Sequence, residues 1–82
     1  MRYENGERIV FLGMHRIDWK PPLTIGKTYI NIGVVDETNQ YAVINDDNGM
    51  ITHFLIEDSG YGYYEFCSLR EYRRKKIFQL NI

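Results

Sequence analysis

Short runs of β-branched and aromatic residues recur along this chain, separated by clusters of Gly, Pro, Asn and Asp. Such runs are typical of β-strands, and the polar clusters are typical of turns. One run alternates apolar and polar residues with the two-residue period of a strand that has one buried face. We therefore expect strands at 7–14, 27–35, 40–47, 50–56 and 63–66.

The segment HRIDWKPPLTIG at 15–26 interrupts this pattern. Pro21 and Pro22 have no backbone N–H to give to a sheet, and Gly26 favours a change of chain direction. The sequence thus predicts a long loop between the first two strands.

The pair Asn48-Gly49 predicts a tight hairpin between the third and fourth strands, because both residues tolerate the positive φ of a type I′ turn. A two-residue loop at this point sets Ile44 opposite His53. In this register both faces of the hairpin are apolar, so another element should cover the outer face.

The C-terminal segment SLREYRRKKIFQLNI has the pattern of a helix over 68–80. Ser68 and Glu71 form a capping box, in which each side chain binds a backbone N–H that the first turn leaves free. Apolar residues recur at helical spacing, although Phe78 points away from their stripe, and a strand over 77–82 is the alternative. We expect the helix to lie over the outer face of the hairpin.

Together these elements predict a mainly β fold, a small SH3-like five-stranded antiparallel barrel with a C-terminal α-helix. The barrel spans 7–66 within a single domain, 1–82. A chain of 82 residues has the size of one domain. Its 44% of apolar residues indicates a globular protein rather than a disordered one.

Three segments resemble a pattern in small proteins from phages and prophages of Gram-positive bacteria: LTIGKTYINIGVV, YAVINDDNGMITHF and SLREYRRKKI. The resemblance covers about residues 7–80. The shared motifs are turns and caps, so they imply a common fold more than a common task, and members are mostly of unknown function. The resemblance implies a phage accessory protein.

The single cysteine, Cys67, can form no internal disulfide, and the N-terminal residues contain no apolar run of signal-peptide length. No segment approaches the length of a membrane span. We expect a protein of the cytoplasm, the host cytoplasm if phage-encoded, without membrane contact, cofactor or metal. His15, His53 and Cys67 show no paired ligand spacing or catalytic motif, so we expect no enzyme.

Charge is distributed unevenly, although the net charge is only −1. No Lys or Arg occurs between Thr28 and Leu69, whereas residues 68–82 carry five bases and one acid. These bases could neutralise the phosphates of a nucleic acid. We favour a solvated helix face, because such runs are usually solvated and the other bases, such as Arg8 and Lys20, are scattered. The five bases of residues 68–82 are Arg70, Arg73, Arg74, Lys75 and Lys76.

The acidic turns that contain Asp46 and Asp47 could imitate the charges of DNA, although acids are also common in turns because of their local hydrogen bonds. Trp19 lies in the long loop, and loops on a rigid scaffold often carry function. With Tyr61 and Tyr63 it could form an aromatic platform for a ligand. Alternatively, Trp19 folds back and plugs one end of the barrel.

The leading hypothesis from the sequence is that this is a non-enzymatic protein that binds a host protein. Inhibition of that host protein is a further expectation of the same hypothesis. Binding of nucleic acid through the basic helix is the first alternative. The second is sequestration of a small nucleotide-like ligand by aromatic residues of a homo-oligomer. The partner-binding residues of the leading hypothesis are Trp19, Asp46, Asp47, Tyr61 and Tyr63.

Overall fold

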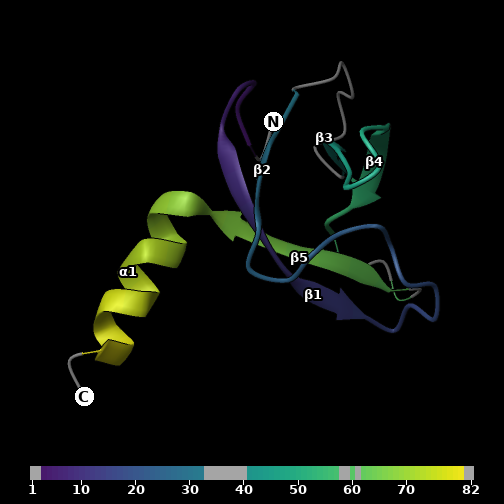
Figure 1. Cartoon of the computed structure of the whole chain (residues 1–82). Helices are drawn as coiled ribbons and strands as arrows, with labels where there is room; N and C mark the ends of the chain where they lie inside the picture. Colours follow the sequence, from purple (N-terminus) through teal and green to yellow (C-terminus); the bar gives the residue numbers. More distant parts are fainter. Residues whose placement is uncertain (1–2, 33–40, 58–59, 61, 81–82) are drawn as a thin grey trace.

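The computed structural model describes residues 3–32, 41–57, 60 and 62–80, with side chains up to residue 75. Within these residues the strands form two antiparallel sheets, of order β2-β1-β5 and β3-β4, and a helix follows the last strand (Figure 1). The predicted class, mainly β with a C-terminal helix, is confirmed. The elements are β1 (Arg8–His15), β2 (Thr28–Ile30), β3 (Tyr41–Asn45), β4 (Ile51–Leu55), β5 (Tyr63–Ser68) and α1 (Leu69–Leu80).

The strand β1 is the centre of the larger sheet, since it pairs with β2 on one side and β5 on the other. Its register with β5 shifts between Phe11 and Gly13. Such a bulge bends a strand and increases its twist. Beyond β2, the Ile32 N–H donates to the Val43 carbonyl at 2.7 Å, which links the chain after β2 to the second sheet.

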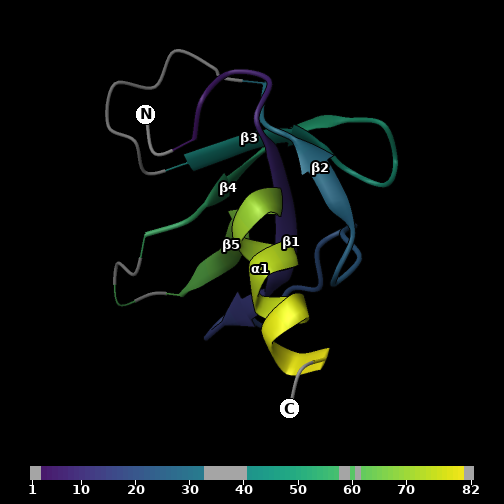
Figure 2. The ribbon, with the colours of Figure 1, turned by 90° about the vertical axis from the view of Figure 1, so that its left-hand side faces the viewer.

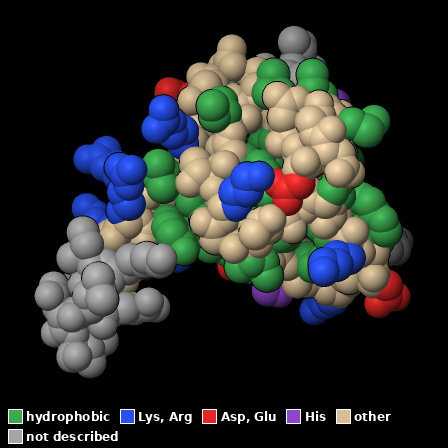
Figure 3. Space-filling model, in the orientation of Figure 1, with side chains coloured by type: hydrophobic (Ala, Val, Ile, Leu, Met, Phe, Trp, Pro, Cys, Tyr) green, Lys and Arg blue, Asp and Glu red, His purple; other side chains and the backbone are tan. Residues whose placement is uncertain are grey.

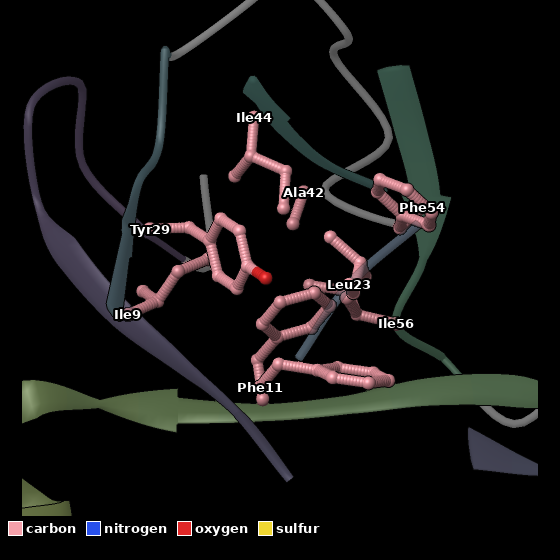
Figure 4. Packing of buried hydrophobic residues seen from close by; sticks show 9 residues of the cluster. Ile9, Phe11, Leu23, Tyr29, Ala42, Ile44, Phe54 and Ile56 are labelled. Atoms are coloured by element: carbon pink, nitrogen blue, oxygen red, sulfur yellow. The ribbon is translucent and has the colours of Figure 1, made fainter. Parts of the chain in front are cut away.

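Side chains from both sheets and from the long loop meet in one core (Figure 4). Phe54 is 1% exposed, and its ring centroid lies 5.0 Å from that of Tyr64 and 6.4 Å from that of Phe66. Aromatic rings bury large apolar areas, so this cluster holds the two sheets together. The core residues are Ile9, Phe11, Leu23, Tyr29, Ala42, Ile44, Phe54, Ile56 and Phe66.

The predicted long loop is present between β1 and β2, and it packs against the body. Leu23 from the middle of the loop is buried in the core. Gly26 has φ 87°, a conformation that favours glycine, and its N–H donates to the Phe11 carbonyl at 2.8 Å. The loop is therefore held at both its centre and its end.

The predicted register of the β3–β4 hairpin is wrong by one residue. Ile44 lies opposite Thr52 rather than His53, and Ala42 lies opposite Phe54. A shift of one residue moves every side chain of a strand to the other face. Ala42, Ile44 and Phe54 consequently share the core, and the other face carries the exposed His53 opposite the buried Val43.

The physical reason for the shift is the turn itself. The Asp46 N–H donates to the Met50 carbonyl, and the Gly49 N–H donates to the Asp46 carbonyl, each at 2.9 Å. Gly49 has φ 77°, whereas Asn48 has no positive φ. This is the geometry of a three-residue loop with a type I turn and a bulge glycine, and the predicted type I′ turn is wrong.

The predicted C-terminal helix is confirmed. Residues 77–80 belong to this helix, so the alternative strand over 77–82 is not found there. The expected position of the helix, over the outer face of the hairpin, is wrong. The main contacts of α1 with the strands are with β1 and β5. Figure 1 shows α1 and the β3–β4 hairpin on opposite sides of the molecule, and Figure 2 views the molecule from the helix side. Because α1 starts where β5 ends, the direction of β5 carries it away from the hairpin. In the described part of the chain, no helix is long and apolar enough to span a membrane.

Candidate anion-binding face of the C-terminal helix

The helix begins at the end of β5 without an intervening loop. The Glu71 N–H donates to the Ser68 Oγ at 3.1 Å, so Ser68 caps the helix as its sequence position predicts. An N-cap serine typically stabilises a helix by about 1 kcal/mol. The strand and the cap together fix where the helix leaves the sheet.

Leu69 and Tyr72 form the inner side of the first turns of α1. Both side chains are partly buried, and residues three apart lie on the same side of a helix. The Tyr72 hydroxyl lies 3.5 Å from the place that a Cβ on Gly26 would take. Tyr72 therefore lies close to the β1–β2 loop.

The exposed residues in the first turns of α1 are cationic except for Glu71. Arg70 and Arg74 lie opposite Leu69 and Tyr72, whereas Arg73 and Lys75 lie at the two edges of the buried side. Arg70, Arg73, Arg74 and Lys75 are exposed, and we call these four residues the basic face. Arg70 and Arg74 lie one turn apart and line the same shallow hollow. Figure 3 shows Lys and Arg side chains gathered around the described part of the helix. The side chain of Lys76 lies outside the described residues.

Arg8, at the start of β1, adds a cation from a second element. The β1–β5 register sets its neighbour Ile9 opposite Ser68, the residue before the helix. Arg8 and Arg70 consequently line one hollow, which Tyr3 also borders. In the sequence Arg8 is one of several scattered bases, because nothing local reveals a neighbour 62 positions away.

Two carboxylates reduce the positive charge where the helix meets the body. Glu7 and Glu71 line the same hollow as Arg8 and Arg70. Glu71 lies in the first helical turn, where a negative charge interacts favourably with the helix dipole. The hollow is therefore nearly balanced in charge, and the positive charge grows outward along the helix toward Arg73.

Asp46, a predicted partner-binding residue, is engaged within its own turn. The residue is 9% exposed. Its carboxylate accepts hydrogen bonds from the Asn48 and Met50 N–H groups and from the Thr52 hydroxyl, at 2.9, 3.0 and 3.0 Å. Burial opposes ionisation, but these hydrogen bonds outweigh it and lower the pKa of Asp46.

Asp47, also predicted to bind a partner, joins the hairpin turn to the β1–β2 loop. Its Oδ1 lies 2.6 Å from the Lys27 Nζ and accepts from the Tyr29 hydroxyl at 3.0 Å. Its Oδ2 accepts from the Thr24 hydroxyl at 2.8 Å. The hydrogen bond with Lys27 is the main cause that lowers the pKa of Asp47 and raises the pKa of Lys27. Asp47 therefore has a structural role in these contacts.

The lowered pKa values of Asp46 and Asp47 predict a loss of stability in acid. The folded state favours the ionised form of these carboxylates. Their contribution to stability is therefore complete above about 3.9, the pKa of an aspartate in the unfolded chain, and it disappears as the pH falls through their lower pKa values in the folded state. We expect the melting temperature to drop as the pH falls from about 5 to about 2, an interval that contains that pKa. Asp47→Asn should flatten this drop, whereas Asp18→Asn on the exposed loop should not. An equal profile for both variants would contradict the Asp47 contacts.

The predicted aromatic platform is not assembled by Trp19 and Tyr63. Trp19 is 59% exposed, so it does not plug an end of the core. Tyr63 stacks on His15, with ring centroids 4.6 Å apart. Tyr61 lies outside the described residues, and in the described part of the chain no ring contact joins Trp19 to Tyr63.

The histidines and the cysteine occupy three separate places. The His15 Nε2 lies 3.1 Å from the Glu65 Oε1 across the β1–β5 pair, and His53 is exposed on the hairpin. Cys67 is buried, and burial raises the pKa of its thiol, which disfavours the reactive thiolate. Among the described residues, no group of three or more His, Cys, Asp or Glu could hold a metal ion.

The fold and the site define a small, mainly β domain that carries a capped, basic C-terminal helix. Comparisons with protein families, with curated proteins and with solved structures find no match to this chain. The geometry of the site is therefore the basis for a functional proposal.

Proposed function

We propose that this is a non-enzymatic binding protein that holds nucleic acid by its phosphate backbone, through the basic face and Arg8. The supporting observation is that Arg8 and Arg70, from different elements, line one hollow, where Glu7 and Glu71 offset part of their charge. Arg73 and Arg74 continue the cationic surface along the exposed side of α1. The helix packs against β1 and β5 and does not cover the outer face of the hairpin, so its bases are not the solvated side of a lid over that face.

The chemistry of the side chains fits phosphate. Four of the five cations in this surface are arginines, whose planar guanidinium groups donate two parallel hydrogen bonds to phosphate oxygens. Neutralising four or five phosphates gives a slope of roughly −4 in log affinity against log salt. Affinity should therefore fall by about two to three orders of magnitude between 50 and 200 mM salt.

Replacement of single cations tests this proposal. Arg74→Ala is expected to reduce the salt slope by about 1 and to weaken binding several-fold at 50 mM salt. Lys20→Ala removes an exposed base from the β1–β2 loop and is the matched control, with an unchanged slope. The measurement is fluorescence anisotropy of a labelled 20-base-pair DNA duplex and of a labelled single strand, after circular dichroism has shown that both variants keep the wild-type spectrum.

Three results would overturn the proposal. One is the absence of binding to any DNA or RNA at 50 mM salt. Another is an equal effect of Arg74→Ala and Lys20→Ala. The third is preferential binding to phosphatidylserine vesicles, which would assign the basic face to a membrane surface.

The β1–β2 loop supports a second candidate function, the binding of a protein partner, which the sequence also led us to expect. Trp19 and Ile25 are 59% and 69% exposed on this loop, and tryptophan is enriched among the residues that dominate protein interfaces. Asp46 and Asp47 do not enter this candidate, because their carboxylates are engaged within the chain. Trp19→Ala should remove any protein captured by the wild type from host lysate and leave DNA binding unchanged. A protein captured equally by both forms would exclude this loop.

An SH3-like barrel, as in the phage proteins that the chain resembles, is the finer description of the fold that accompanies these proposals. It is supported by the bulge in β1 and by the hydrogen bond from Ile32 to Val43 that links the two sheets. An experimental structure in which β3–β4 separates from β2 and β5 would overturn it.

A further inference from the structure

We infer that the nucleic acid is duplex DNA and that α1 enters its major groove. This inference rests on the proposed function and names the ligand of the same surface. It follows from three features of the described residues, namely the shape of the helix, the surroundings of the hollow and the distribution of charge over the chain.

The shape of α1 suits a wide groove. A helix of 12 residues is about 18 Å long and about 10–12 Å across with its side chains. Figure 1 shows its second half extending away from the strands. The major groove of B-form DNA is about 12 Å wide and admits a helix, whereas the major groove of A-form RNA is too narrow.

The surroundings of the hollow that Arg8 and Arg70 line disfavour the binding of a single-stranded nucleic acid. Proteins that hold single strands usually offer open aromatic faces on which the bases stack. Of the two aromatic residues that line the hollow, Phe66 is 8% exposed and its ring packs against Phe11 at 5.3 Å. Tyr3 is partly buried against the core, and its hydroxyl donates to the Phe66 carbonyl at 3.0 Å. Neither ring offers a broad face to a base.

The distribution of charge orients the molecule with its helix toward DNA. Residues 1–67 carry five Lys and Arg and ten Asp and Glu, whereas residues 68–82 carry five Lys and Arg and one Glu. The phosphates of a duplex repel the acidic body and attract the helix, so the complementary contact is the helix together with the neighbouring Arg8. Arg73 and Arg74 then lie within the groove, and Arg8 reaches a phosphate at its edge.

The test compares three labelled ligands of one sequence, a 20-base-pair DNA duplex, the corresponding RNA duplex and single-stranded DNA. We expect the DNA duplex to bind at least tenfold more tightly than the other two at the same salt. Methyl green, which occupies the major groove, should displace the protein, and netropsin, which occupies the minor groove, should not. Arg73→Ala should weaken binding of the DNA duplex, and Lys20→Ala is the control.

The outcomes separate this inference from the proposed function. Equal affinity for all three ligands, or displacement by netropsin alone, would overturn the groove assignment and leave phosphate binding intact. No binding of any of the three would overturn both. Retention of full affinity by a correctly folded Arg73→Ala variant would also exclude insertion of the helix.

Discussion

Gly62→Ala is expected to destabilise the protein by about 3–5 kcal/mol, the sum of backbone strain and steric overlap. Gly62 has φ 113°, which L-residues rarely adopt. A Cβ at this position would lie 2.7 Å from the His15 carbonyl oxygen, 2.8 Å from the Arg16 carbonyl oxygen and 2.7 Å from the Ile17 Cγ1. Two of these atoms belong to the backbone, so relief requires the strand ends to move apart.

The consequence is large, because a chain of this length has a free energy of unfolding of only about 4–12 kcal/mol. Urea unfolding measures the change. Gly6→Ala is the matched control, since Gly6 has φ 84° and its Cβ would meet nothing within 4 Å. This control should cost only about 1–2 kcal/mol. Equal losses for the two variants would show that the chain does not approach Gly62 as closely as described.

Asn31→Ala is expected to destabilise the protein by about 2–4 kcal/mol, because it leaves the buried Val43 N–H and two partly buried carbonyls without this partner. Asn31 is 3% exposed. Its Nδ2 donates to the carbonyls of Tyr3 and Glu4, each at 3.0 Å, and its Oδ1 accepts from the Val43 N–H at 3.2 Å. One side chain thus joins the N-terminal segment, the end of β2 and the second sheet.

Asn45→Ala is the matched control for Asn31, since Asn45 is exposed at the end of β3 and surface substitutions usually change stability by about 0.5 kcal/mol or less. Thermal and urea unfolding of both variants check the prediction. A loss of less than about 1 kcal/mol for Asn31→Ala would contradict the three contacts. Tyr3 borders the hollow that contains Arg8, so we also expect Asn31→Ala to weaken DNA binding more than Asn45→Ala does.

The hairpin turn shows how a local motif can be recognised and still be placed wrongly. Asn48-Gly49 predicts a tight turn, and Gly49 does supply the positive φ. The three-residue loop is stabilised by Asp46, whose carboxylate accepts three hydrogen bonds in this turn. An aspartate three residues before a glycine is a recognisable signal for such a turn. With that signal, the register of the hairpin could have been predicted.

Some features of the candidate site depend on neighbouring residues and can be predicted from the sequence, whereas others depend on distant segments and cannot. The sequence shows the run of bases and the cap at Ser68, because a helix start depends on hydrogen bonds within four residues. It does not show that Arg8 lies beside Arg70, which depends on the register between β1 and β5. Nor does it show that Asp47 is held by Lys27, a contact across 20 positions.

By itself, therefore, the sequence determined the succession of strands along the chain, the long loop and the capped terminal helix. Each of these depends on φ preferences, side-chain periodicity and hydrogen bonds between near neighbours. The tertiary structure alone decided what packs against the hairpin, where α1 lies and which cations share a surface. Those features depend on pairing between distant segments, where a shift of one residue costs little locally and exchanges every contact.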